Sequence, residues 1–279
     1  MATAITRQEG LDKFYTIPSV AKECLQKVGL RYSWDFWDLV VEPSAGNGSF
    51  FLQIPTPKKI GIDLAPEHPQ IQPQDFFFYG PSTSGKILVV GNPPFGRISS
   101  LAVKFFNHAA NFASVIAFIV PRTFRRRSVQ NKLDAFFHLV HDSEIPLEPC
   151  AFSPPMMAKC CFQIWEKSDQ ARVFEDLPLT HPHWTFLGYG PLDENGQPTP
   201  PNGADFAIRA YGGNCGELRI LELETLRPKS WHWSKASIDM NVLVQRFHSL
   251  DYSISQDTAR QNSIGRAELV LLYQEAYGH

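Results

Sequence analysis

The stretch DLVVEPSAGNGSF, residues 38–50, decides the fold class of this chain. Its first five residues form an apolar, β-branched run that predicts a buried strand ending in Glu42. Gly46 and Gly48 follow as a tight turn, because glycine lets the backbone adopt positive φ and approach other groups closely. A buried strand that runs into a glycine turn and a helix is typical of an α/β sheet, although a plain glycine turn fits the same letters.

Similar runs recur further along the chain. They predict strands at 59–63, 86–90, 115–120 and 158–165, and the apolar spacing predicts a helix at 100–113. Strands that alternate with helices indicate a parallel, Rossmann-like α/β sheet, in which ligands bind at the carboxyl ends of the strands. Position 51 is Phe, so the dinucleotide spacing G-x-G-x-x-G is not met, which counts against a nicotinamide cofactor.

After about Lys167 the composition changes. Prolines crowd a Gly- and Asn-rich stretch, and short runs at 204–209 and 218–223 predict strands. We therefore expect a first domain at residues 1–167 and a loop-rich α+β appendage at residues 168–279. The first part carries 17 Lys and Arg against 14 Asp and Glu, and the second 9 against 14, so a phosphate partner is expected on the first.

Composition narrows the class of protein. Of 279 residues, 43% are apolar, which is typical of a soluble globular chain. The five cysteines are odd in number and form no C-x-x-C pair, so we expect reduced thiols in a reducing compartment, cytoplasm or nucleus. The first ten residues do not read as a signal peptide, no apolar run is long enough to span a membrane, and the histidines form no metal-site pattern.

The segment Asn92-Pro93-Pro94-Phe95 directly follows the third predicted strand. The exocyclic amine of adenine is a poor nucleophile, because its lone pair is delocalised into the ring. Asn92 offers a side-chain oxygen and Pro93 a backbone carbonyl that could accept its two N–H groups, Pro94 stiffens the loop, and Phe95 could stack on an unstacked base. A rigid turn without function is the alternative interpretation.

Acidic residues mark two further predicted strand ends. Glu42 could accept from an ammonium or a ribose hydroxyl, and Asp63 could take both hydroxyls of a ribose. Asp75 could accept from the amine of a bound adenine nucleoside, with Phe76 alongside its ring. Each could instead be a cap or a solvated side chain.

Together these segments resemble the class I methyltransferases that use S-adenosylmethionine, and among them the N6-adenine (amino) methyltransferase family. EPSAGNGSF, at 42–50, is similar to that family's cofactor motif, and NPPF, at 92–95, to its catalytic (D/N)-P-P-(Y/F/W) motif. FYTIP, at 14–18, resembles the F-Y-T-P segment of many DNA adenine methyltransferases, with an extra Ile17. The order of the motifs is similar to the γ arrangement, in which a target-recognition region follows the catalytic domain, so the resemblance implies a catalytic domain at residues 1–167 and a substrate-recognition region at residues 168–279.

The resemblance implies S-adenosylmethionine as cofactor and no metal. The cofactor-binding residues would be Tyr15, Thr16, Glu42, Pro43, Ala45, Gly46, Gly48, Asp63, Asp75 and Phe76. The catalytic residues would be Asn92, Pro93, Pro94 and Phe95. One departure from the family is that Pro55 and Pro57 cut short the helix after the glycine turn.

A run of arginines follows the fourth predicted strand, at the same edge of the sheet. We expect Arg122, Arg125, Arg126 and Arg127 to bind phosphates of a substrate strand, the alternative being a solvated helix start.

The expected function is methyl transfer to adenine N6 in nucleic acid, with DNA favoured over RNA. The alternatives are an RNA adenine methyltransferase, a protein glutamine methyltransferase, and a non-catalytic subunit that keeps the fold. A partner subunit is neither indicated nor excluded.

Overall fold

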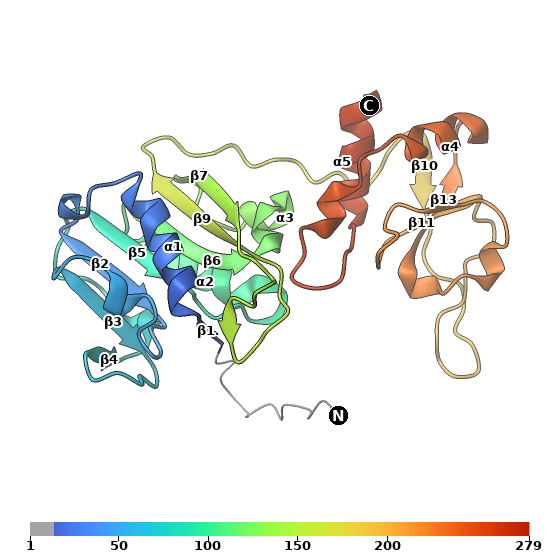
Figure 1. Ribbon diagram of the computed structural model, residues 1–279. Helices are drawn as coiled ribbons and strands as arrows, with labels where there is room; N and C mark the ends of the chain where they lie inside the picture. The colour runs from blue at the N-terminus through green and yellow to red at the C-terminus, as the bar shows by residue number, and fades with distance from the viewer. Residues whose placement is uncertain (1–13, 279) are drawn as a thin grey trace. The chain divides into compact units, whose positions relative to one another are not determined.

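Two compact units make up residues 14–278, the part of the chain that the computed structural model describes. The first unit ends at Phe174 and the second begins at Glu175 (Figure 1). The sequence places the change a few residues earlier, after Lys167. Each unit has hydrophobic cores of its own, and each is described by itself. The residues on which the expectation of no signal peptide rests lie outside the described ones.

A seven-stranded sheet forms the centre of the first unit. In spatial order its strands are β4 (Ile71–Pro73), β3 (Lys59–Asp63), β2 (Leu39–Pro43), β5 (Ile87–Gly91), β6 (Val115–Pro121), β9 (Cys160–Lys167) and β7 (Phe137–Glu144). The first five are parallel, and β9 lies antiparallel between β6 and β7. This order confirms the predicted α/β, Rossmann-like sheet, and each predicted strand lies within two residues of an observed one.

Helices cover both faces of this sheet. Helix α1 (Pro18–Gly29) packs on the face that carries Val40 and Leu88. Helices α2 (Ser100–Ala110) and α3 (Arg127–Gln130) pack on the face that carries Val41 and Val89 (Figure 1). Successive strand residues point to opposite faces, so strands covered on both sides read as continuous apolar runs.

The order of the strands reverses between β2 and β5. From β2 the chain runs outward to β3 and β4, and then returns to β5 on the other side of β2. Val41 pairs with Val89 in this parallel register, so the loops after β2 and β5 leave the same edge side by side. Such a reversal is the usual ligand site of an open α/β sheet.

The glycine turn after β2 does not lead into an α-helix. Only the 3-10 turn Phe51–Gln53 forms there, because Pro55 and Pro57 follow at once and proline ends a helix. A second short pairing joins β1 (Tyr15–Thr16) antiparallel to β8 (Phe152–Ser153).

The second unit is an α+β structure, as predicted. Its four antiparallel strands, in spatial order, are β10 (Trp184–Phe186), β13 (Trp231–Ala236), β11 (Phe206–Arg209) and β12 (Leu218–Arg219). Helices α4 (Met240–His248) and α5 (Arg266–Tyr277) pack in its core with Trp184 and Phe206. The expected strand at 218–223 is wrong beyond Arg219.

Candidate active site

Glu42 lies at the end of β2, against the end of β5. Its side chain is 3% exposed, and its Oε2 has no hydrogen-bond partner among the described residues. A Cβ on Gly91 would lie 3.0 Å from Glu42 Cγ, so the glycine, with φ +153°, leaves room for the carboxylate. Two strand ends that are distant in the sequence therefore meet around one buried acid.

Burial raises the pKa of Glu42 well above its usual value. The charge of Asp63 adds to this effect, while a backbone hydrogen bond from Phe51 and the charge of Lys59 oppose it. Desolvation disfavours the ionised carboxylate, and a cation placed beside it would reverse the preference. Glu42 is thus suited to a ligand that carries a positive charge or a hydrogen-bond donor.

A cage of hydrogen bonds holds the glycine loop. The Gly46 N–H donates to Asp63 Oδ2 at 2.8 Å, and the Ala65 N–H donates to Asp63 Oδ1 at 2.8 Å. The ring of Tyr15 covers Gly46 so closely that an added Cβ would lie 2.6 Å from Tyr15 Cε1. Gly46 has φ +52°, a conformation that favours glycine. Both oxygens of Asp63, which were expected to accept from ribose hydroxyls, therefore accept from backbone N–H groups and hold the loop in its conformation.

Glu67 completes this cage, and sequence reasoning missed it. Its N–H donates to the carbonyl of Gly46 at 3.0 Å, and its carboxylate accepts from the Tyr15 hydroxyl. Burial, followed by this hydrogen bond, raises the pKa of Tyr15. Glu67 stands in a proline-flanked loop where no motif marks it, so its role depends on contacts that only folding creates.

Asp75 and Phe76 have structural roles of their own. Asp75 caps the 3-10 turn Phe76–Phe78 by accepting from the Phe77 N–H at 2.9 Å. The ring of Phe76 is 3% exposed and lies 5.2 Å from that of Phe105, so it has little surface left for a ligand. Phe77, at 37% exposed, is the better candidate for a ring contact. The signal that could have found it is the run of three phenylalanines at 76–78.

The two polar atoms of the Asn92 side-chain amide differ in their partners among the described residues. Its Nδ2 donates to the carbonyl of Phe14 at 3.3 Å, while its Oδ1 is buried without a partner among the described residues. The loop is anchored beyond it, because the carbonyl of Phe95 accepts from the N–H groups of Leu101 and Ala102 at the start of α2. Asn92 thus presents a fixed, unused acceptor.

Among the described residues, four buried atoms without a hydrogen-bond partner lie in or beside the loops at this edge: Thr16 Oγ1, Glu42 Oε2, Asn92 Oδ1 and Arg122 Nε. A buried polar atom without a partner costs free energy, and such atoms are expected where a ligand supplies the missing hydrogen bond. Beside the glycine loop lies a hollow of about 160 Å³, lined by Pro18, Asn47, Gly48, Ser49, Leu52 and Gln53. This hollow is lined by the glycine loop, the 3-10 turn after it and the start of α1, so the fit of a polar ligand to the loops after β2 and β5 rests on the unpaired atoms alone.

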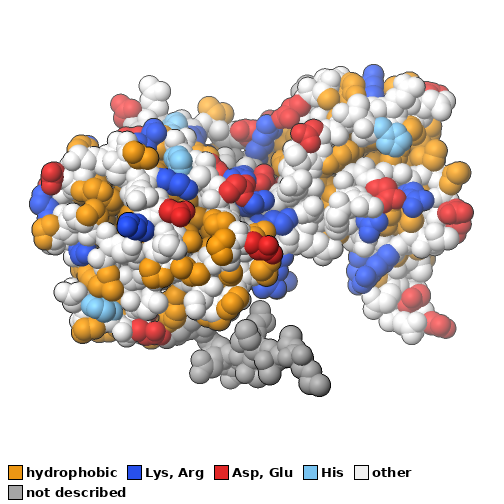
Figure 2. All heavy atoms as spheres, in the orientation of Figure 1, with side chains coloured by type: hydrophobic (Ala, Val, Ile, Leu, Met, Phe, Trp, Pro, Cys, Tyr) orange, Lys and Arg blue, Asp and Glu red, His pale blue; other side chains and the backbone are white. Residues whose placement is uncertain are grey.

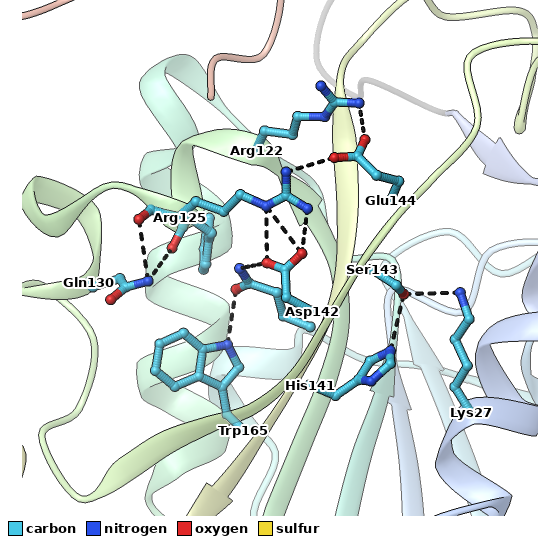
Figure 3. A network of polar contacts seen from close by, with 11 residues as sticks. Lys27, Arg122, Arg125, Gln130, His141, Asp142, Ser143, Glu144 and Trp165 are labelled. Atoms are coloured by element: carbon cyan, nitrogen blue, oxygen red, sulfur yellow. Dashed lines mark hydrogen bonds and ion pairs between the residues drawn. The ribbon is translucent and has the colours of Figure 1, made fainter. Parts of the chain in front are cut away.

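The arginine segment adjoins the Asn92 loop. Ser99 Oγ and Thr123 Oγ1 are 2.6 Å apart and share a hydrogen bond. Arg122 forms an ion pair with Glu144, and Arg125 with Asp142 and Glu144, both on β7 (Figure 3). Acidic and basic side chains are interspersed on the visible face of the first unit in Figure 2, in contrast to the single-signed stripe typical of strong phosphate binders.

Residues 14–278, the described part of the chain, contain no group of three or more His, Cys, Asp or Glu side chains placed to hold a metal ion. They also contain no helix with the length and apolar character needed to cross a membrane.

Comparison with solved structures finds methyltransferases of several kinds. The chain is 18% identical to a Pyrococcus horikoshii protein provisionally described as an RNA methyltransferase, over 57% of this chain and 88% of that one, with a TM-score of 0.42. It is 13% identical to the 23S rRNA methyltransferase ErmE, over 57% and 72%, with a TM-score of 0.40. It is 12% identical to a magnesium protoporphyrin IX methyltransferase from Synechocystis with bound S-adenosylmethionine, over 54% and 77%, with a TM-score of 0.38.

No protein-family model matches the sequence, and no curated protein matches it. Structural similarity at this level assigns no activity to the chain. The fold itself, a Rossmann-like α/β sheet with β9 antiparallel between β6 and β7, is what the chain shares with these methyltransferases.

Proposed function

We propose that this protein is an S-adenosylmethionine-dependent methyltransferase that acts on adenine N6 in nucleic acid, with the first unit as its catalytic domain. The observation that carries the proposal is the buried Oδ1 of Asn92, which has no partner in residues 14–278 and lies at the strand-order reversal next to the buried Glu42. An acceptor held in this way is what a weakly nucleophilic amine requires.

S-adenosylmethionine suits the loops after β2 and β3. Glu42 accepts from its ammonium or ribose hydroxyls, and Gly46 and Gly48 bring the backbone close to it. The other residues assigned to it are Tyr15, Thr16, Pro43, Ala45, Asp63 and Asp75, with Phe77 in place of Phe76 as the exposed ring. When bound, the cofactor supplies an electrophilic methyl group.

The chain's own residues then prepare the amine. Asn92 Oδ1 and the carbonyl of Pro93 accept its two N–H groups, which draws the nitrogen toward tetrahedral geometry and stabilises the charge that develops on it. Phe95 stacks on the unstacked base. No general base is needed, because the methylated ammonium is a strong acid and loses its proton readily.

DNA is the first choice of substrate, because the order of the motifs resembles that of DNA adenine methyltransferases. RNA is the second, since an NPPF motif also serves in families that resemble RNA adenine methyltransferases and the appendage is acidic. A protein glutamine methyltransferase and a non-catalytic subunit are the remaining alternatives. The arginines after β6 favour nucleic acid.

The test is transfer of an isotope-labelled methyl group from S-adenosylmethionine to duplex DNA, single-stranded DNA and RNA, each then digested to nucleosides and analysed by mass spectrometry. We expect label in N6-methyladenine of at least one substrate. Asn92→Ala should reduce turnover by about 10²- to 10³-fold with cofactor binding nearly unchanged. Asn195→Ala, in an exposed loop, serves as the control. Full activity of Asn92→Ala, or label in another nucleoside, would reject the assignment.

A further inference from the structure

Arg122, Arg125 and Glu144 form a small cluster at the carboxyl ends of β6 and β7. Glu144 accepts from Arg125 Nη1 at 2.7 Å and also from Arg122 Nη2 (Figure 3). Two guanidinium groups from one segment thus converge on a single carboxylate. Arginine pairs arranged in this way are well suited to a phosphate group, which offers several acceptor oxygens to their planar forks.

The two acids of the cluster differ in how firmly they are held. Asp142 receives Arg125 Nε at 3.1 Å on both of its oxygens and Gln163 Nε2 at 2.7 Å, and Trp165 in turn donates to Gln163 at 3.0 Å. Gln163 is fully buried. The Glu144 side chain, by contrast, is 52% exposed against 22% for Asp142. Asp142 therefore fixes Arg125, whereas Glu144 can swing into solvent.

The cluster lies within reach of the proposed base pocket. Gly91 of β5 pairs with Phe118 of β6, and Arg122 follows four residues later, with its N–H still bonded to Lys159. Because Gly91 is level with Phe118, Asn92 is level with the next residue of β6. Arg122 lies three residues further along the chain, which at the rise of a β-strand is roughly 10 Å. The Ser99–Thr123 hydrogen bond ties the two loops together. A phosphate next to a nucleotide held at Asn92 would come near the two arginines.

We propose that Glu144 is a displaceable counter-ion in a phosphate-binding site formed by Arg122 and Arg125, and that a phosphodiester of the substrate strand replaces it. The inference deepens the proposed function and rests on it. An exposed ion pair is weak, so its exchange for a phosphate costs little. Before nucleic acid binds, the Glu144 carboxylate occupies the site and so lowers the affinity for nucleic acid in general. A strand that places a phosphate at the two arginines displaces the carboxylate and binds.

The test is the affinity of Glu144→Gln for a fluorescent single-stranded oligonucleotide, as DNA and as RNA of equal sequence, measured by anisotropy without cofactor. Removal of the counter-ion should lower the Kd for the DNA or the RNA oligonucleotide, or for both, by about 3- to 5-fold. A change of this size corresponds to the free energy of an exposed ion pair. The affinity should also fall more steeply with salt, because a solvent anion now takes the place of the Glu144 carboxylate beside Arg122 and is released on binding.

Two matched variants isolate the effect. Glu23→Gln removes the same charge from the exposed side of α1 and should change the affinity little. In a background with both Arg122→Gln and Arg125→Gln, Glu144→Gln should lose most of its gain. The inference is overturned if Glu144→Gln binds neither strand better than Glu23→Gln, or if the gain persists without the two arginines. Binding is read without methyl transfer, so an absent methylation product would reject the proposed function and leave this result standing.

Discussion

At the scale of single residues, the site is built from groups that folding leaves unsatisfied. Among the described residues, Glu42 is buried with one oxygen unpaired, and Asn92 has its N–H₂ group engaged while its oxygen finds no partner. Neither arrangement stabilises the fold, because a buried polar atom without a partner lowers the free energy of unfolding. A ligand that supplies the missing donors recovers this cost, so stability and binding should change in opposite directions when these residues are altered.

Glu42→Gln tests this opposition. The pKa of Glu42 is raised in the folded state, so protonated Glu42 favours the folded protein at low pH. This contribution to the free energy of unfolding is lost as pH rises above the usual pKa of 4.5. Without cofactor, the variant should therefore be more stable than the parent at pH 7, and its stability should depend less on pH. Thermal unfolding between pH 4 and 8 measures both.

The same variant should bind S-adenosylmethionine more weakly. In the parent protein, binding of this cation favours the ionised carboxylate, so the affinity should rise with pH until Glu42 is ionised in the free protein as well. Calorimetric titration at several pH values gives this dependence. Equal affinity and equal pH dependence in parent and variant would remove Glu42 from the cofactor site.

The sequence could predict Glu42 and Asn92, because each follows a readable strand within a motif. It could not predict that Asp63 shapes the glycine loop or that the ring of Phe76 lies in the core. Those roles depend on partners such as Gly46 and Phe105, which lie far from them in the sequence. Glu67 is the clearest case, since nothing in its neighbours marks it.

At the scale of elements, long buried strands were predictable and short pairings were not. Strands β5 and β6 are covered by helices on both faces, which imposes an apolar run that a reader of the sequence can see. The pairing of β1 with β8 joins two-residue strands, and no local pattern specifies it. Yet this pairing carries Tyr15, whose ring covers Gly46. The glycine loop is therefore held by a contact between elements instead of by a helix of its own.

Gly46→Ala tests that contact. The new Cβ would lie 2.6 Å from the Tyr15 ring, and alanine at φ +52° adds roughly 1–2 kcal/mol of backbone strain. We expect a lower melting temperature and at least about 10-fold weaker cofactor binding, because the loop must shift. Gly80→Ala is the matched control, since its Cβ would meet nothing within 4 Å. If both variants bind the cofactor equally well, the loop does not need its observed conformation.

At the scale of the whole molecule, the two units have separate cores and different charge. Residues 1–167 carry a small excess of basic residues and residues 168–279 an excess of acidic ones. The end of the first unit is fixed by Arg172, which donates to the carbonyls of Phe137 at 2.6 Å and Gln130 at 3.1 Å. Every residue assigned to cofactor or base lies before this anchor. The second unit is therefore proposed to select the substrate.

A chain that ends after Phe174 tests this division of labour. It keeps Arg172 and the hydrophobic cores of the first unit, so it should bind S-adenosylmethionine with an affinity within about threefold of the full chain, a difference of less than 1 kcal/mol. Methyl transfer to nucleic acid should fall by a larger factor, because the unit proposed to select the substrate is missing. Residues 175–279 alone should bind no cofactor. Undiminished transfer by the shortened chain would instead place substrate selection within the first unit, at the loops after β5 and β6.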